Sequence, residues 1–80
     1  FENLNETFDN IITNPPFTRG KEIIKLWVEE SHNHLNSPGI LQLVATKKFR
    51  YIEVLLKKYF DKFEIFNKKG DYIIYLAYKK

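Results

Sequence analysis

Apolar and polar positions change along the chain in a way that predicts four strands and two helices. The expected strands are the short, mainly apolar segments 8–13, 40–46, 63–67 and 72–78. The expected helices are 21–35 and 48–60, where apolar residues recur at helical spacing. The resulting order, β-α-β-α-β-β, is typical of an α/β fold. Residues 1–7 are polar and are expected to form a lead-in loop.

The expected strand 40–46 is apolar on both faces, which is typical of a central strand in a parallel sheet covered by helices. Residues 8–46 therefore predict a right-handed βαβ unit. The segment 68–71, Lys-Lys-Gly-Asp, predicts a tight turn with a positive φ at Gly70, so the last two strands form an antiparallel hairpin. The first strand would lie at the sheet edge, where an uncovered apolar strand invites pairing. We expect a missing N-terminal half, or self-association, to cover that edge.

Composition narrows the range of partners. The 80 residues suffice for one small domain, and the absence of cysteine excludes disulfides and thiolate metal sites. No apolar run approaches the roughly 18 residues of a membrane span, and no secretory signal is visible, so we expect a cytoplasmic protein with no membrane partner. His32 and His34 lie two positions apart on a helix and point in different directions, so we expect no metal site. The net charge of +3 and the pI near 9.2 favour an anionic partner such as nucleic acid.

The segment Asn14-Pro15-Pro16-Phe17 closes the first expected strand and is the main candidate for a binding site. Consecutive prolines lack backbone N–H donors and fix φ at about −65°, and the residue before them is pushed toward extended geometry. The chain should therefore leave the strand stiff and straight, with an amide side chain, bare carbonyls and an aromatic ring at its tip. The alternative is a proline-stiffened loop whose phenylalanine belongs to the core.

Basic residues follow both strands of the expected parallel pair. Arg19 and Lys21 come after the first strand, and Lys47, Lys48 and Arg50 come after the second. Ligands of open α/β folds bind beyond the carboxyl ends of parallel strands, so these cations are placed to bind the phosphates of a nucleic acid, in a salt-sensitive way. The alternative is a solvated helix start. Further lysines are expected to be ordinary surface residues: Lys57, Lys58, Lys62, Lys68, Lys69, Lys79 and Lys80.

The segment from Phe8 to Phe17 resembles motif IV of the class I S-adenosylmethionine-dependent methyltransferases that act on amino nitrogens. The resemblance extends to about residue 78 and points to the small-methyltransferase family, which includes guanine-N2 methyltransferases of ribosomal RNA. The further residues that carry it are Gly20-Lys21, Glu29-Glu30, His34-Leu35, Pro38-Gly39, the strand from Leu41 to Ala45 and the ending from Phe60 to Tyr78. The resemblance implies a Rossmann-like fold.

The sequence departs from the family pattern in two places. The family's Pro-Gly-Gly is Pro38-Gly39-Ile40 here. The glycine-rich loop that holds the methyl donor is missing, as is the acidic residue that binds its ribose. The resemblance therefore implies that residues 1–80 form a single partial domain, the C-terminal, acceptor-side half of a methyltransferase. We expect this half to bind S-adenosylmethionine weakly and to be inactive alone.

The resemblance also implies roles for the tetrapeptide. The Asn14 side-chain oxygen and the Pro15 carbonyl would each accept an N–H bond from an exocyclic amino group and would be the catalytic residues. Pro16 would keep the segment rigid, and Phe17 would stack on the base. Guanine N2 of ribosomal RNA is the leading target. Two alternatives stay open, namely methylation of adenine N6 or of a protein glutamine, and a non-catalytic RNA-binding module that keeps a relict methyltransferase shape.

Overall fold

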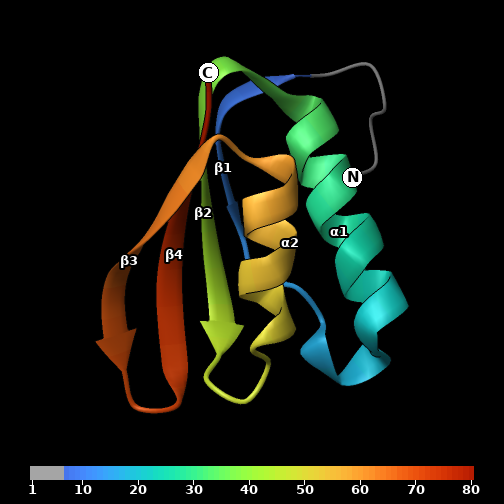
Figure 1. The fold of residues 1–80 in the computed structure, drawn as a ribbon, viewed down its shortest axis with the longest axis vertical. Helices are drawn as coiled ribbons and strands as arrows, with labels where there is room; N and C mark the ends of the chain where they lie inside the picture. Colours follow the sequence, from blue (N-terminus) through green and yellow to red (C-terminus); the bar gives the residue numbers. More distant parts are fainter. Residues whose placement is uncertain (1–6) are drawn as a thin grey trace.

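The computed structural model describes residues 7–80 and contains a four-stranded sheet with two helices (Figure 1). The elements are β1 (Phe8–Thr13), a 3₁₀ turn η1 (Phe17–Arg19), α1 (Lys21–His34), β2 (Leu35–Thr46), α2 (Tyr51–Tyr59), β3 (Lys62–Lys69) and β4 (Tyr72–Lys79). The strand order is β1-β2-β4-β3, with β1 and β2 parallel and the other pairs antiparallel. The predicted α/β class, the parallel pair, the edge position of β1 and the terminal hairpin are confirmed. The lead-in loop lies outside the described residues except for Thr7, which has no regular structure.

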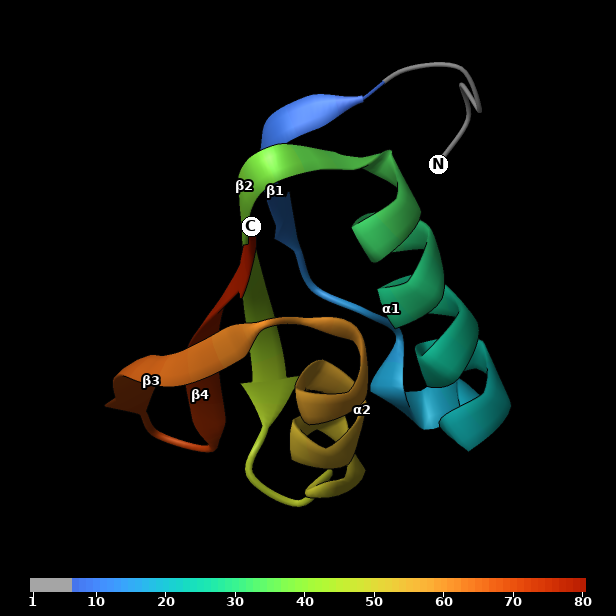
Figure 2. The ribbon, with the colours of Figure 1, turned by 45° about the horizontal axis from the view of Figure 1, so that its top comes forward.

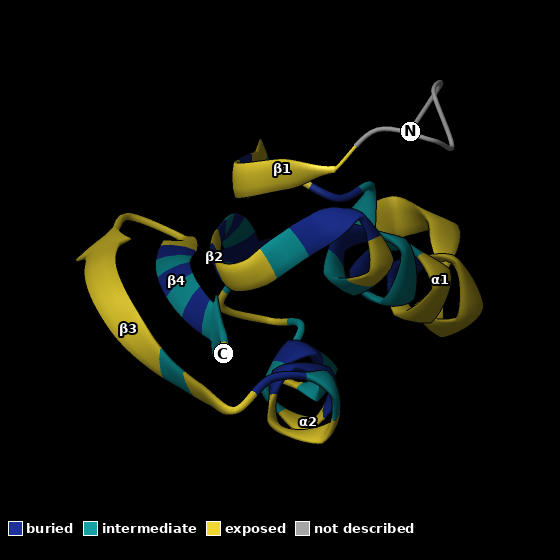
Figure 3. Ribbon diagram, turned by 90° about the horizontal axis from the view of Figure 1, so that it is seen from above, coloured by how far each residue is buried: buried dark blue, intermediate teal, exposed yellow. Residues whose placement is uncertain are grey.

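Both helices pack on the same face of the sheet (Figures 2 and 3). Along β2 the side chains of Leu41, Leu43 and Ala45 are fully buried, because they point at α1 and α2. The core that these side chains form with the helices and the other strands consists of Ile11, Ile24, Val28, Leu35, Leu41, Leu43, Ala45, Ile52, Leu55, Leu56, Phe60, Ile73, Tyr75 and Ala77. The helical stripes predicted for α1 and α2 therefore supply the helix side of the core.

No helix or strand within residues 7–80 covers the opposite face of the sheet, which we call the open face (Figure 3). Ile12 is 73% exposed there and Ile40 is 36% exposed, whereas Ile11 and Leu41 beside them are buried. The central position predicted for 40–46 is confirmed, but the expectation of helices on both faces is met on one face only. An apolar, uncovered sheet face is unusual for a stable monomer, because exposed apolar patches normally mark contact surfaces.

Strand β2 begins five residues earlier than predicted, directly after α1. Residues 36–39 separate the predicted helix from the predicted strand, but they belong to β2, whose first residue, Leu35, is 2% exposed and is paired with Phe8 of β1. Lys79 Nζ also donates hydrogen bonds to the carbonyls of His32 and Leu35, at 2.8 and 2.9 Å. These bonds satisfy carbonyls at the end of the helix, where they lack helical partners. The chain therefore passes from helix to strand without an intervening loop.

The other boundaries differ by smaller amounts. Helix α2 begins at Tyr51 instead of residue 48, because the chain first makes a tight turn in which the Phe49 N–H donates to the Thr46 carbonyl at 3.1 Å. Strand β3 extends to Lys69, so the hairpin turn consists of Gly70 and Asp71. Gly70 has φ +59°, which confirms the predicted positive φ.

Tyrosine–glutamate hydrogen bonds join the two helices to each other and to the sheet. The Tyr59 hydroxyl of α2 donates to Glu29 of α1 at 2.6 Å. The Tyr75 hydroxyl of β4 donates to Glu53 of α2 at 2.7 Å. Burial, followed by this hydrogen bond and the Glu53 charge, raises the pKa of Tyr75 well above its ordinary value. The hydroxyl therefore stays protonated and keeps α2 in place over the sheet.

Candidate functional site

The parallel strands β1 and β2 end at the same edge of the sheet, at the lower end of the molecule in Figure 1. The η1 turn, the β2–α2 connection and the β3–β4 hairpin tip all lie at this end. Trp27 of α1 anchors the end of β1, because its indole N–H donates to Thr13 Oγ1 at 2.7 Å. The tetrapeptide that follows Thr13 therefore starts from a fixed position.

The tetrapeptide projects its amide side chain to solvent and buries its first proline. Asn14 is exposed and its side chain makes no hydrogen bond to another residue of the described range 7–80, whereas Pro15 is buried. The Phe17 N–H donates to the Pro15 carbonyl at 3.0 Å, and the Arg19 N–H donates to the Pro16 carbonyl at 3.0 Å. The predictions of bare carbonyls and of a straight exit are therefore wrong, because the chain folds at once into η1. A carbonyl oxygen has two lone pairs, so Pro15 retains one for a further donor.

An aromatic cluster joins the tetrapeptide to the β2–α2 connection. The rings of Phe17 and Phe49 lie 5.0 Å apart between centroids, and those of Phe49 and Tyr51 lie 6.2 Å apart. Lys21 Nζ lies 5.3 Å from the centroid of the Tyr51 ring, a cation–π distance. Phe17 is half-buried against the core, so the core interpretation of this residue holds for part of its surface.

A pocket of about 420 Å³ opens at this edge, and we call it the edge pocket. Its lining consists of Phe17, Thr18, Thr46, Lys47, Lys48, Phe49, Asp71 and Tyr72. The volume falls in the range of small-molecule sites, about 300–1,000 Å³. The edge pocket brings together three predicted site residues, Phe17, Lys47 and Lys48. It adds Phe49, Asp71 and Tyr72, which the sequence interpretation missed.

The other predicted site residues lie outside the lining of the edge pocket. Asn14, Pro15 and Pro16 precede Phe17 at the tip of β1. Lys21 lies over Tyr51, and Arg50 Nε lies 4.0 Å from a Glu53 carboxylate oxygen, a contact on the exposed surface that is worth little. Arg19 is exposed. The five predicted cations thus follow the two strand ends, but only two of them line the pocket.

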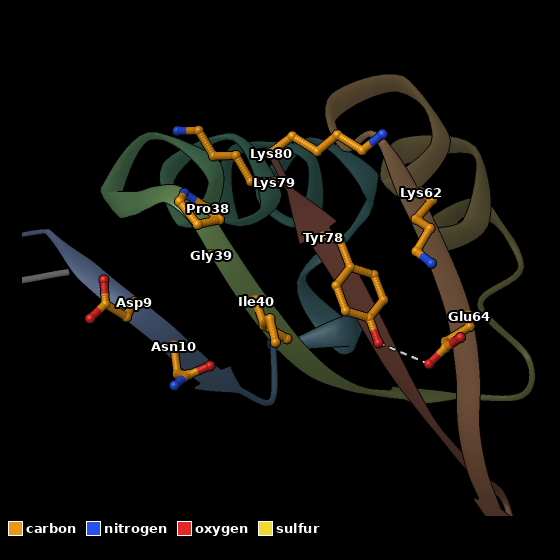
Figure 4. Close-up of a pocket in the computed structure, with 10 residues that line it drawn as sticks. All are labelled: Asp9, Asn10, Pro38, Gly39, Ile40, Lys62, Glu64, Tyr78, Lys79 and Lys80. Carbon is orange, nitrogen blue, oxygen red and sulfur yellow. Dashed lines mark hydrogen bonds between the residues drawn. The ribbon is translucent and has the colours of Figure 1, made fainter.

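A larger pocket of about 650 Å³ lies at the other end of the sheet, on the open face (Figure 4). Its lining consists of Asp9, Asn10, Pro38, Gly39, Ile40, Lys62, Glu64, Tyr78, Lys79 and Lys80. Tyr78 lies between Ile40 and Glu64 and donates a 2.9 Å hydrogen bond to the glutamate. This pocket is remote from the carboxyl ends of the parallel strands, and it contains no predicted catalytic residue. We therefore place the candidate site at the edge pocket.

The two histidines take part in packing and pairing. The His32 ring packs edge-on against Phe60 at 5.2 Å, and burial, followed by the Lys79 charge, lowers the pKa of His32. His34 is buried and its Nε2 lies 3.4 Å from a Glu30 carboxylate oxygen.

No group of three or more potential metal ligands occurs in the part of the chain that the structure describes. No helix of residues 7–80 is long and apolar enough to cross a bilayer.

Several known proteins are similar to this chain in sequence. Ribosomal RNA small subunit methyltransferase C of Photorhabdus laumondii is 34% identical over 84 residues, which cover 100% of this chain and 25% of that protein. The uncharacterized protein YbxB of Bacillus subtilis is 36% identical over 76 residues, which cover 92% of this chain and 38% of that protein. The chain therefore spans about a quarter to two fifths of these relatives.

Solved structures agree with these relatives. The Thermus thermophilus 16S rRNA N2 G1207 methyltransferase RsmC, solved in complex with AdoMet and guanosine, superposes with a TM-score of 0.79 at 30% identity. The superposition covers 94% of this chain and 21% of that one. A methyltransferase from Pyrococcus furiosus gives a TM-score of 0.68 at 27% identity, covering 92% of this chain and 41% of that one. The fold thus matches part of the RsmC methyltransferase fold.

The family itself is identified by its sequence profile. The profile of the methyltransferase small domain matches residues 1–76, nearly the whole chain. The match includes both parallel strands, the tetrapeptide and most of the terminal hairpin. The resemblance predicted from the tetrapeptide and the spacing of the later segments is therefore confirmed. The chain belongs to the methyltransferase small domain family.

Proposed function

We propose that this chain supplies the acceptor side of an S-adenosylmethionine-dependent methyltransferase that modifies an exocyclic amino group of RNA, with guanine N2 of ribosomal RNA as the leading target. The observation that carries the proposal is the exposed Asn14 amide, which makes no hydrogen bond to another described residue and lies at a parallel strand end beside a basic, aromatic pocket. The RsmC relative, whose complex contains AdoMet and guanosine, supports the choice of guanine. An RNA substrate of this kind also fits the predicted cytoplasmic location.

The catalytic contribution of the chain is to hold and orient the acceptor nitrogen. An exocyclic amino group is a weak nucleophile because its lone pair is delocalised into the base. The Asn14 side-chain oxygen and the remaining lone pair of the Pro15 carbonyl each accept one N–H of that group. These two bonds aim the nitrogen lone pair and stabilise the positive charge that grows on nitrogen during transfer. The turn that follows, from Phe17 to Arg19, fixes the Pro15 carbonyl for this purpose.

The cations and the aromatic ring of the same edge bind the rest of the substrate. Lys47 and Lys48 line the edge pocket and are exposed, so they reach phosphates of the RNA. Phe17 has one surface packed on Phe49 and the core, and it presents the rest of its ring to the pocket. This geometry suits a ring that stacks on the target base, since the packed side prevents the ring from moving away.

The described residues do not fit the methyl donor. The loop after β1 begins with Asn14 and two prolines, so it cannot offer the run of backbone N–H donors that binds an anionic group. The chain has three glycines, and they lie far apart at positions 20, 39 and 70. When bound, S-adenosylmethionine supplies the methyl group. We assign its binding to the part of the protein that relatives carry beyond this segment.

The same division explains the uncovered surfaces of the fold. Within residues 7–80 strand β1 has a free edge, and the open face exposes Ile12 and Ile40 beside the larger pocket. The segment occupies 21% of the RsmC chain and 41% of the Pyrococcus furiosus chain. A donor-binding half that pairs with β1 and packs on the open face would cover both surfaces. In this proposal residues 1–80 are the C-terminal half of one domain.

Donor binding tests the partial-domain proposal. Isothermal titration of the 80-residue chain with S-adenosylmethionine is expected to show no micromolar affinity, because the donor loop is missing. The same titration with the protein that includes the upstream half is expected to show it. Micromolar binding by the 80 residues alone would contradict the proposal.

Acceptor assays test the proposed substrate. The whole protein, supplied with S-adenosylmethionine labelled in its methyl group, is expected to label small-subunit ribosomal RNA that lacks the modification, and nuclease digestion is expected to place the label on guanine N2. Adenine-containing DNA and a glutamine peptide serve as competing acceptors. Label on adenine N6 or on glutamine would replace the proposed substrate with one of those. RNA binding without any transfer would indicate a non-catalytic RNA-binding module.

A further inference from the structure

Tyr72, on the β3–β4 hairpin, differs from the other tyrosines in the contacts of its side chain. The chain has five tyrosines, at positions 51, 59, 72, 75 and 78, and all lie in the described range. The hydroxyls of Tyr59, Tyr75 and Tyr78 each donate to a glutamate, at 2.6, 2.7 and 2.9 Å. Tyr51 packs between Phe49 and Lys21. Tyr72 is 51% exposed, and its side chain makes no hydrogen bond or ring contact with another residue of 7–80.

The pairing register places Tyr72 directly at the candidate site. Tyr72 is paired with Thr46 of β2 on one side and with Lys69 of β3 on the other. Directly paired residues project from the same face of a sheet, so these three side chains form a row at the sheet end. The Lys47 N–H also donates to the Asp71 carbonyl at 2.8 Å, which ties the hairpin tip to the β2–α2 connection. The tip is therefore held in place and is part of the site.

Tyr72 and Phe17 line the edge pocket from different elements. Strands β1 and β4 flank β2 on its two sides, so Phe17 reaches the pocket from the β1 side and Tyr72 reaches it from the β4 side. Lys47 and Lys48 line the pocket with them, against one acidic residue, Asp71. Two aromatic rings separated by lysines match the chemistry of single-stranded nucleic acid, in which bases alternate with phosphates.

From this arrangement we infer that Tyr72 and Lys69 form a second nucleotide subsite, in which the Tyr72 ring stacks on a base that flanks the target and Lys69 binds an adjoining phosphate. The inference rests on the proposed function and deepens it, because it assigns the substrate as a single-stranded RNA segment of at least two nucleotides. It also changes the expectation for Lys69, which the sequence interpretation treated as ordinary surface. Since the ring is already exposed at the edge pocket and the hairpin backbone is held by its pairing and by the Lys47–Asp71 bond, binding requires no rearrangement of the hairpin.

The test measures RNA affinity of the whole protein, by fluorescence anisotropy of a labelled single-stranded RNA that contains the target guanine. Tyr72→Ala is expected to weaken binding about ten-fold, within the range of roughly 5- to 150-fold that corresponds to loss of one base–aromatic stack. Tyr72→Phe keeps the ring and is expected to bind within about two-fold of the parent. Phe66→Ala is the matched control, because Phe66 is 64% exposed on β3 of the same hairpin but does not line the edge pocket.

Each outcome separates the inference from the proposed function. If the parent protein methylates RNA while Tyr72→Ala binds as tightly as the parent, the subsite is wrong and the proposed function stands. If Tyr72→Phe or Phe66→Ala loses as much affinity as Tyr72→Ala, the loss does not come from stacking and the inference is overturned. If the parent methylates no RNA, the proposed function fails, whatever the affinities are. Circular dichroism of each variant verifies that the hairpin is folded.

Discussion

Replacing Asn14 with alanine in the whole protein is expected to lower kcat for RNA methylation by about 100-fold or more. The change removes one of the two oxygen atoms proposed to accept N–H bonds from the acceptor amino group. Removing one preorganised group of this kind typically costs about 10²–10³ in kcat. Single-turnover assays with saturating RNA and labelled S-adenosylmethionine measure the effect on the chemical step.

The structure indicates that Asn14→Ala should affect catalysis and leave folding and RNA affinity nearly unchanged. Asn14 is exposed and its side chain makes no hydrogen bond to another residue of the described range, so the substitution should leave the fold intact. The pocket residues Phe17, Lys47 and Lys48 are unchanged, so RNA affinity should stay within about two-fold of the parent, because phosphate and stacking contacts provide it. Loss of kcat without loss of binding is therefore the expected signature.

Asn10→Ala is the matched control for Asn14→Ala. Asn10 is an exposed asparagine on β1, the strand that Asn14 follows, but it lines the remote pocket on the open face. Its substitution is expected to leave kcat unchanged. A reduction of less than about three-fold for Asn14→Ala, or an equal loss for Asn10→Ala, would remove Asn14 from the catalytic role.

Much of the fold follows from patterns that are local in the sequence. The apolar runs and the helical stripes determine which segments become strands and helices, and Gly70 marks the hairpin turn. The parallel pairing of β1 with β2 follows from the intervening helix. The tetrapeptide lies at a strand end because two prolines cannot continue a ladder. These features required no knowledge of distant contacts.

The missed features depend on contacts between distant segments. The hydrogen bonds from Lys79 to the end of α1 join residues 44 and 47 positions apart, and no local pattern predicts them. Tyr72 joins the site only because β4 pairs with β2 in a register that aligns it with Thr46. A signal was present, since a strand that runs antiparallel to β2 starts at the edge where β2 ends. Phe49 was missed because helix α2 was expected to begin before it.

The apolar strand 40–46 illustrates a partial success of the same kind. Its two apolar faces correctly predicted a central position in the sheet, but residues 7–80 cover only the face that carries Leu41, Leu43 and Ala45. The other face, which carries Ile40, stays uncovered within residues 7–80. Since burial of apolar surface is the main stabilising term in folding, this uncovered face supports the proposal that another part of the protein completes the sheet.

The second large effect is expected at Gly39, where the chain approaches itself closely. A Cβ added to Gly39 would overlap the Asn36 carbonyl oxygen and lie 2.6 Å from Leu35 Cγ. Leu35 is 2% exposed and belongs to the core, so it cannot move aside without opening a gap. Gly39→Ala is therefore expected to lower the free energy of unfolding by about 3 kcal/mol, the cost of overpacking a site that cannot relax. Urea unfolding of the whole protein, followed by circular dichroism, measures the change.

Gly70→Ala is the control, because the cause of its cost is different. Nothing lies within 4 Å of a Cβ added at Gly70, but φ is +59°, so alanine is strained there by about 1 kcal/mol. Gly70→Asn should recover part of that cost, because asparagine tolerates the left-handed region, whereas Gly39→Asn should be at least as unfavourable as Gly39→Ala. A Gly39→Ala variant as stable as the parent would show that the passage from α1 to β2 relaxes readily. In that case space at Gly39 would not explain why a glycine follows Pro38, and the close approach to Asn36 would not limit the residue at this position.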